Sequence, residues 1–191
     1  SLCDTEVISP DNKYAAFTKD FNLWVREISS GEEHPLTHDG EACYAYAAAG
    51  SAWGGVPIEV EPAIQARWSV DSKRLFTVQR DTRRVKDLPI VHHVPQTGIL
   101  RPIVENYKVA YPGDEHVETL RLVSIDVDSG QVRAADYRHI PVTRNGHGFF
   151  SSKLGWWSND SRHAYFVDIA RDYKTAGVVE FDTHTGRTKV L

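Results

Sequence analysis

One turn motif occurs three times in this chain: as Trp68-Ser69-Val70-Asp71-Ser72-Lys73, as Trp157-Ser158-Asn159-Asp160-Ser161-Arg162 and, without the tryptophan, as Ser9-Pro10-Asp11-Asn12-Lys13. Serine and aspartate side chains in such a stretch accept hydrogen bonds from nearby backbone N–H groups, and the asparagine or serine that follows tolerates the dihedral angles of a tight turn. The chain therefore reverses direction at each copy. Recurrence of such a turn indicates an architecture built from repeats.

Short strand-like segments follow each turn. The first comes at once, and after a polar reversal there is a second, with the apolar pattern of a half-buried strand. A glycine then supplies the positive φ of a further turn, and a short last strand follows. These three segments are expected at 14–17, 22–28 and 34–37; at 75–78, 120–126 and 131–134; and at 164–167, 177–182 and 188–191. Four antiparallel strands per repeat are typical of a β-propeller blade.

The sequence therefore predicts an all-β fold, a partial β-propeller of about three four-stranded antiparallel blades in a single domain. We expect blade 1 at about 4–42, an inter-blade loop at 43–62, blade 2 at about 63–136 with an insertion at 79–118, and blade 3 at about 149–191. Long insertions in compact domains are uncommon and are often functional. Two strand-like segments in the insertion, Leu88–Val94 and Ile103–Tyr111, predict a projecting hairpin, which we call the arm.

Composition limits the classes of partner. The chain has 191 residues, of which 41% are hydrophobic, enough for one sizeable core. Its formal net charge of -4 gives little attraction to phosphate backbones or anionic membrane surfaces, so nucleic acid and membrane are excluded as leading partners. The longest apolar stretches are too short to span a bilayer. Because the chain starts at Ser1 without a targeting segment, we expect it to be cut from a longer polypeptide.

No metal site and no cofactor are expected. Cys3 and Cys43 have neither a zinc-ligand spacing nor the number needed for a disulfide framework, so ordinary thiols are expected. The histidines His92-His93 and the segment Asp114-Glu115-His116 show no recognised ligand spacing, and adjacent side chains of a strand point to opposite faces.

The residues resemble a known family. The Trp-Ser-x-Asp-Ser turns and the strand around Leu23-Trp24-Val25 are similar to those of the prolyl oligopeptidase family of serine peptidases. The segment 107–117, which reads Tyr-Lys-Val-Ala-Tyr-Pro-Gly-Asp-Glu-His-Val, resembles the dipeptidyl peptidase IV branch more closely. The resemblance covers nearly the whole chain. It implies a fragment of an N-terminal propeller that caps an α/β-hydrolase domain, with the active site between the two, and an exported bacterial enzyme that is periplasmic or secreted.

The resemblance also implies that the catalytic residues lie elsewhere. The hydrolase part of such an enzyme carries a Gly-x-Ser-x-Gly nucleophile elbow, followed along the chain by Asp and His. This sequence contains no such pentapeptide, since Gly50-Ser51-Ala52-Trp53-Gly54 has the wrong spacing. Without an exposed, activated serine, we expect no peptide hydrolysis by this chain alone. The C-terminal α/β-hydrolase domain of the same polypeptide and a peptide substrate are the implied partners.

Two glutamates are the candidates for substrate selection. Family members that release dipeptides hold the substrate's free α-ammonium with a pair of acidic residues, through charge-assisted hydrogen bonds. The corresponding loop, 53–62, lacks an adjacent acidic pair, and Glu59 and Glu61 are its only carboxylates. In a strand both would point to the same face. The alternative interpretation is a solvated strand face.

A charged cluster, Arg80-Asp81-Thr82-Arg83-Arg84, follows a predicted central strand. Arg80 and Arg83 could line the substrate cavity, because guanidinium groups suit the carboxylate and carbonyl acceptors of a peptide. The alternative is a surface cluster whose charges pair with one another.

The arm is the candidate for subunit contact. In the family branch that the sequence resembles, the corresponding arm packs against a second subunit, which implies a homodimer with Leu88, Ile90, Val109 and Tyr111 in the contact. Apolar residues on a projecting arm would otherwise remain in water. The alternative is an arm folded back onto its own propeller.

Two function classes remain open. One is a non-catalytic domain that gates and selects substrates in a serine exopeptidase, the full-length enzyme releasing N-terminal dipeptides. The other is a free-standing propeller that binds protein or glycan.

Overall fold

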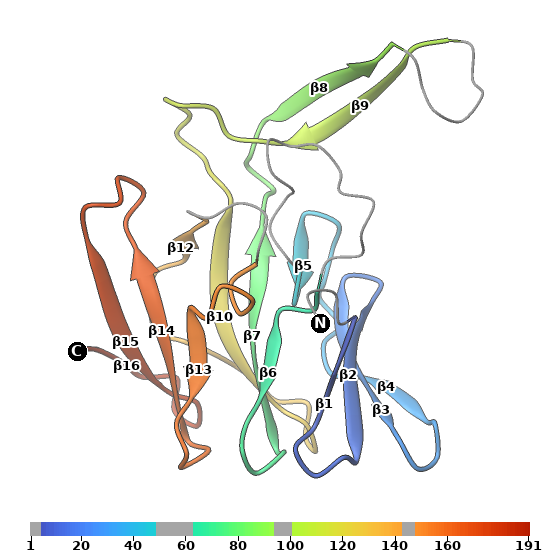
Figure 1. The fold of residues 1–191 in the computed structure, drawn as a ribbon, viewed down its shortest axis with the longest axis vertical. Helices are drawn as coiled ribbons and strands as arrows, with labels where there is room; N and C mark the ends of the chain where they lie inside the picture. Colours follow the sequence, from blue (N-terminus) through green and yellow to red (C-terminus); the bar gives the residue numbers. More distant parts are fainter. Residues whose placement is uncertain (1–4, 49–62, 94–100, 143–147) are drawn as a thin grey trace.

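The structure is a computed structural model and describes residues 5–48, 63–93, 101–142 and 148–191. Within these ranges all the helix-or-strand structure is β-strand, arranged as three sheets that stand side by side and a separate hairpin (Figure 1). No helix among the described residues is long and apolar enough to cross a membrane. The prediction of an all-β fold is confirmed.

The first sheet has four antiparallel strands in chain order. They are β1 (Glu6–Ile8), β2 (Tyr14–Lys19), β3 (Asn22–Glu27) and β4 (Glu33–Pro35). The third sheet repeats this plan with β13 (Gly155–Trp157), β14 (His163–Ile169), β15 (Ala176–Asp182) and β16 (Thr188–Val190). Alternate residues of β14 are buried, as expected for a strand with one face on a core.

The second sheet has six strands rather than the four that the sequence predicts. Its central pair is β7 (Arg74–Asp81) with β10 (Thr119–Asp126), flanked by β6 (Ala66–Trp68) and β11 (Val132–Ala134). Two more short strands, β5 (Tyr44–Tyr46) and β12 (Ile140–Pro141), pair with the other halves of β7 and β10. The central strands have eight residues each, so each outer edge has room for two short strands end to end.

Two predicted boundaries are corrected by the second sheet. Residues 43–62 were expected to be a loop, but β5 lies inside that range because its backbone pairs with the last three residues of β7. The insertion was expected to begin at residue 79, but β7 continues to Asp81, held by its pairing with Thr119.

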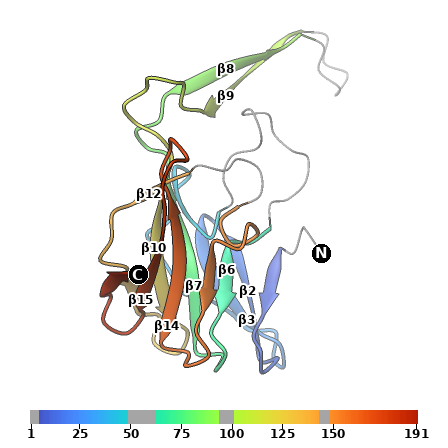
Figure 2. The same cartoon turned by 60° about the vertical axis from the view of Figure 1, so that its left-hand side comes forward.

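The predicted hairpin is present. Strands β8 (Asp87–His92) and β9 (Ile103–Lys108) form a two-stranded antiparallel sheet that projects beyond the end of the other sheets (Figure 2).

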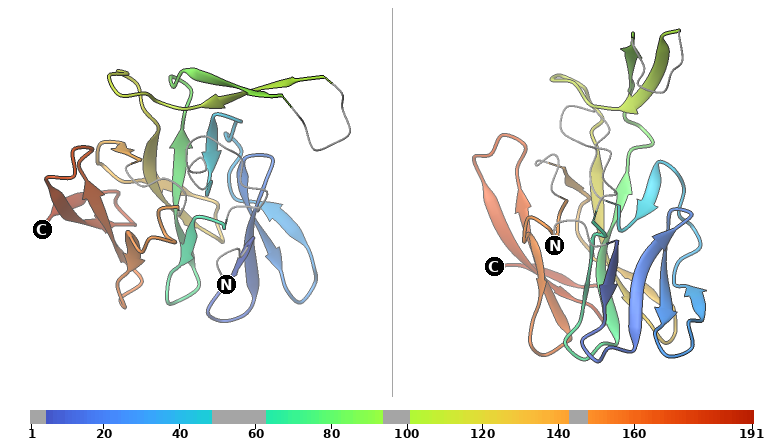
Figure 3. Two further views of the ribbon diagram at one scale, coloured as in Figure 1. Left: turned by 45° about the horizontal axis from the view of Figure 1, so that its top comes forward. Right: turned by 45° about the vertical axis from the view of Figure 1, so that its right-hand side comes forward.

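The three sheets stand next to one another (Figure 3), and two apolar cores join them, one at each interface. Between the first and second sheets, Leu23 and Val25 face Leu75, Val123 and Ile125, all of which are fully buried. Between the second and third sheets the core is aromatic, with buried members Phe76, Phe149, Phe150, Phe166 and Phe181. Large aromatic side chains contribute much of the buried apolar area in such cores.

The same two hydrogen bonds recur at both interfaces. The indole Nε1 of Trp68 donates to Val7 O at 2.9 Å, and that of Trp157 donates to Arg67 O at 2.9 Å. At the turns, Asp11 N donates to Ser72 Oγ and Asp71 N donates to Ser161 Oγ, each at 3.0 Å. The repeated turn therefore reverses the chain and also ties each sheet to its neighbour.

Candidate functional site

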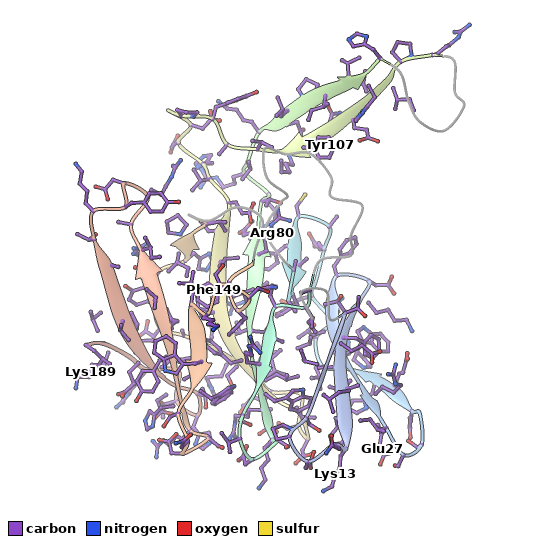
Figure 4. All side chains as sticks on the ribbon, viewed as in Figure 1. Lys13, Glu27, Arg80, Tyr107, Phe149 and Lys189 are labelled. Carbon is purple, nitrogen blue, oxygen red and sulfur yellow. The ribbon has the colours of Figure 1, made fainter. Side chains whose placement is uncertain are left out.

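The predicted arginines lie at the end of β7 nearest the arm. Figure 4 places Arg80 there, with Tyr107 beyond it on the arm. Arg80 forms a bidentate pair with Glu118: Nε lies 2.7 Å from Oε1 and Nη2 lies 2.9 Å from Oε2. Both side chains are largely buried, with 19% and 12% of their surface exposed, so the pair is held in a fixed geometry.

Arg83 is paired on the neighbouring turn. Its Nε and Nη2 lie 3.0 and 2.7 Å from the two carboxylate oxygens of Asp81, and its guanidinium lies 3.9 Å from the ring centroid of Tyr44. The hydrogen bond from Arg83 holds the pKa of Asp81 below its usual range. Arg83 is half-exposed, so this pair is accessible from solvent.

The sequence interpretation missed a third arginine at the same end of the sheet. Arg121 Nη1 donates to Gln79 Oε1 at 3.0 Å and to Tyr44 OH at 3.5 Å. Its hydrogen-bond partners are neutral, unlike those of Arg80 and Arg83. Gln79 has no exposed surface, and its Nε2 finds no hydrogen-bond partner among the described residues. The only sequence signal for this group was Gln79, a polar residue that directly follows the predicted apolar strand 75–78.

A tyrosine anchors the adjoining strand. Tyr46 is buried, and its hydroxyl donates to Asp39 Oδ1 at 2.8 Å. Burial raises the pKa of Tyr46 well above its ordinary value, and the Asp39 carboxylate raises it further. The phenol therefore remains a neutral hydrogen-bond donor that joins β5 to the connection between β4 and β5.

Taken together, these residues form a cationic rim, which we define as Arg80, Arg83 and Arg121 with Gln79 and Tyr44. The guanidinium groups of this rim can donate hydrogen bonds to carbonyl or carboxylate oxygens of a ligand, most readily at Arg121, which forms no ion pair with any described residue. The predicted amine-binding residues, Glu59 and Glu61, lie outside the described residues. No group of three or more His, Cys, Asp or Glu side chains is placed to hold a metal ion in the described part of the chain.

The arm exposes apolar surface on both faces. Leu88, Ile90 and Val109 are half-buried, and Tyr111 is 54% exposed. The sequence interpretation missed Val91 and Val104, which oppose each other across the two strands and are 45% and 59% exposed. These valines lie on the opposite face of the hairpin from Leu88 and Ile90, because side chains alternate along a strand.

Three polar side chains are joined by hydrogen bonds on the face of the arm that carries Leu88. Glu105 accepts hydrogen bonds from Tyr107 OH and, at 3.1 Å, from His92 Nε2. The bond to Glu105 raises the pKa of Tyr107 to about 12.

Comparison with known proteins places these observations in a family. A family model described as the dipeptidyl peptidase IV (DPP IV) N-terminal region matches residues 3–191. The probable dipeptidyl-aminopeptidase B of Uncinocarpus reesii is 26% identical over 121 residues, which are 60% of this chain. The chain spans only 11% of that curated relative.

Two crystal structures share the fold. Dipeptidyl peptidase 4 of Porphyromonas gingivalis superimposes with a TM-score of 0.68 at 15% identity, over 97% of this chain and 24% of that one. A putative dipeptidyl aminopeptidase IV from Bacteroides ovatus gives a TM-score of 0.64 at 17% identity, over 98% of this chain and 23% of that one. At these identities the structures bear on the fold alone.

Proposed function

Because this chain belongs to the DPP IV N-terminal region family, we propose that it is the non-catalytic, substrate-selecting part of a serine-type dipeptidyl peptidase. The observation that carries the proposal is the family match over residues 3–191, nearly the whole chain. The three sheets act as consecutive propeller blades that border a reaction chamber, and an α/β-hydrolase domain of the same polypeptide supplies the catalytic residues.

The sequence chemistry supports this division of labour. A serine peptidase of this kind needs a nucleophile on a strained elbow, with a base and an oxyanion hole beside it. The sequence contains no Gly-x-Ser-x-Gly elbow. Selection needs only fixed charges at a set distance from the nucleophile, and a rigid sheet is a suitable support for them.

Glu59 and Glu61 are our candidates for binding the free α-ammonium of the peptide. A carboxylate pair holds an ammonium through charge-assisted hydrogen bonds, and its distance from the nucleophile decides how many residues are released. The cationic rim provides the complementary contact, with Arg83 and Arg121 meeting carbonyl or carboxylate oxygens of the peptide. Arg80 supports the rim through its pair with Glu118.

We further propose that the arm contributes to a homodimer. The exposed valines Val91 and Val104, together with Tyr111, give it apolar surface at a distance from the cores of its own chain. Leu88, Ile90 and Val109 add half-buried apolar surface to the same hairpin region.

Covalent labelling tests the catalytic half of the proposal. The full-length protein is treated with a fluorophosphonate probe, which reacts with activated serines, and the labelled peptide is identified by mass spectrometry. We expect the label on a serine outside residues 1–191, and pretreatment with a dipeptidyl peptidase substrate should slow the labelling. A label on a serine within these residues would overturn the proposal.

A further inference from the structure

A polar cavity opens between the second and third sheets, at the end that carries the repeated Ser-x-Asp turns. Its volume is about 260 Å³. The second sheet lines it with Arg74, Ser124, Asp126 and Arg133, and the third sheet adds Thr183 and His184. It lies outside the cationic rim, which is at the other end of β7.

The cavity lies where the second repeat has Arg74 and Ser124 at the positions that Tyr14 and Val25 occupy in the first repeat. Tyr14 and Arg74 occupy equivalent positions, since the N–H of each donates to the serine five residues before it. The cross-strand register then aligns Val25 with Ser124. At the first interface Tyr14 stacks on Trp68 with ring centroids 6.4 Å apart, and Val25 is fully buried. At the second interface Arg74 and Ser124 line the cavity instead.

Two buried hydrogen-bonding groups in the cavity wall have no hydrogen-bond partner in the part of the chain that the structure describes. Ser124 is 1% exposed, and neither its Oγ nor the buried Nε of Arg133 forms a hydrogen bond with any described residue. The two residues face each other across the β10–β11 pair, so both donors belong to one side of the cavity. Buried polar groups are nearly always paired, so two unsatisfied groups in one wall indicate a missing hydrogen-bond partner.

The charge of the lining is positive. Arg74 is neutralised by Asp126, with Nη2 3.0 Å from Oδ2. Asp126 is the only carboxylate that lines the cavity within the described part of the chain, so Arg133 is left as an excess cation. His184 stands on the opposite wall, where its ring N–H can donate a hydrogen bond into the cavity.

We propose that this cavity binds a small oxyanion, such as inorganic phosphate, sulfate or a short dicarboxylate. The hydroxyl of Ser124 and the Nε–H of Arg133 donate to its oxygens, and His184 approaches it from the third sheet. Guanidinium and hydroxyl donors are the groups with which proteins commonly hold phosphate and carboxylate. A bound oxyanion would link the second and third sheets at the place where the apolar core between them ends.

Calorimetric titration of the full-length protein with inorganic phosphate, sulfate and succinate in separate experiments tests the site. We expect saturable binding of at least one of the three, and the ranking shows whether the site prefers tetrahedral oxyanions or carboxylates. Arg133→Met should weaken binding about tenfold or more, because it removes the excess charge and a donor. Arg84→Met is the matched control: it removes an exposed arginine elsewhere on the second sheet's connections and should leave the affinity unchanged.

Ser124→Ala separates binding from folding. Without added anion, this variant should be as stable as the wild type or more stable, because it removes an unsatisfied buried hydroxyl. With phosphate present, its melting temperature should rise less than that of the wild type. A selenate-soaked crystal should show anomalous density between Ser124 and Arg133. The proposal is overturned if no probe binds saturably, or if Arg133→Met and Ser124→Ala bind phosphate as the wild type does.

Discussion

At the scale of single residues, the second serine of the repeated turn has two roles: it helps to reverse the chain, and it joins neighbouring sheets. Ser72 and Ser161 adopt a left-handed backbone conformation, with φ of 62° and 54°, and their hydroxyls accept the N–H of Asp11 and Asp71 in the preceding sheet. The turn chemistry alone predicted the reversal of the chain. It could not predict the partner of the hydroxyl, because that partner lies 61 or 90 residues away along the chain.

Loss of one serine hydroxyl should loosen one interface locally. Ser161→Ala leaves Asp71 N–H without its acceptor, which costs about 1 kcal/mol, so that amide should exchange about fivefold faster. Hydrogen exchange followed by mass spectrometry on the peptide that contains Asp71 measures this. Thr175→Ala, at an exposed turn of the third sheet, is the control. Equal exchange in the wild type and Ser161→Ala would show that the hydroxyl does not join the sheets.

The ion pair between Asp182 and Arg162 should make stability depend on pH. Burial alone raises the pKa of Asp182, but Arg162 and the N–H groups of Thr185 and His184 outweigh it and lower the pKa to about 2. The ionised form therefore stabilises the fold above the ordinary carboxyl pKa of about 4, and this contribution is lost as the pH falls towards 2. The melting temperature of Asp182→Asn should lie below that of the wild type at pH 7, and the difference should narrow below about pH 4. A difference that stays constant to pH 3 would contradict this explanation.

At the scale of elements, three glycines close the same turn but meet different surroundings. Gly31, Gly130 and Gly186 all have positive φ. A Cβ at Gly31 would meet nothing within 4 Å, whereas one at Gly186 would lie 2.8 Å from Ala134 O in the neighbouring sheet. The sequence predicted the glycine turns. It could not distinguish the glycine at an interface from the glycine in open solvent.

Alanine substitutions should separate these two roles. Gly31→Ala places an alanine in a left-handed backbone conformation without a steric contact, so it should lower the free energy of unfolding by about 1 kcal/mol. Gly186→Ala must also displace Ala134 O and should cost about 2–3 kcal/mol. Urea unfolding of the two variants measures the difference. Equal midpoints would mean that the second and third sheets are not in the close contact described.

The arm is the element whose role in assembly can be tested most simply. Val91→Lys with Val104→Lys places charge on two exposed residues, so the fold should be unaffected. Charges buried unpaired in an interface are strongly unfavourable, so a dimer that uses this face should dissociate. Sedimentation velocity of the full-length protein at several concentrations gives the result, with Thr175→Lys as the control for a lysine added at an exposed position away from the arm. A dimer that persists in the double variant would exclude this face of the arm.

At the scale of the whole molecule, the repeat explains how far the sequence could predict the structure. Each copy of the turn defines a sheet, so the all-β fold and the order of the strands within the first and third sheets were accessible from the pattern. Strand β5 was not, because Tyr44–Tyr46 is too short for a periodic pattern and depends on pairing with Gln79 to Asp81. For the cationic rim, the sequence named Arg80 and Arg83 as candidates, and their role stays a prediction. It could not add Arg121, which lies on another strand, 42 residues away from its partner Gln79.

The selecting role is tested most directly by comparing two substrates in one assay. A Gly-Pro anilide with a free amino terminus and its N-acetylated form are given to the full-length protein, to the Glu59→Gln, Glu61→Gln double variant and to an exposed control, Glu32→Gln. We expect the double variant to lose about a hundredfold or more in kcat/KM on the free-amine substrate, and with it the preference over the acetylated one, while fluorophosphonate labelling persists. Unchanged discrimination between the two substrates in the double variant would contradict the account.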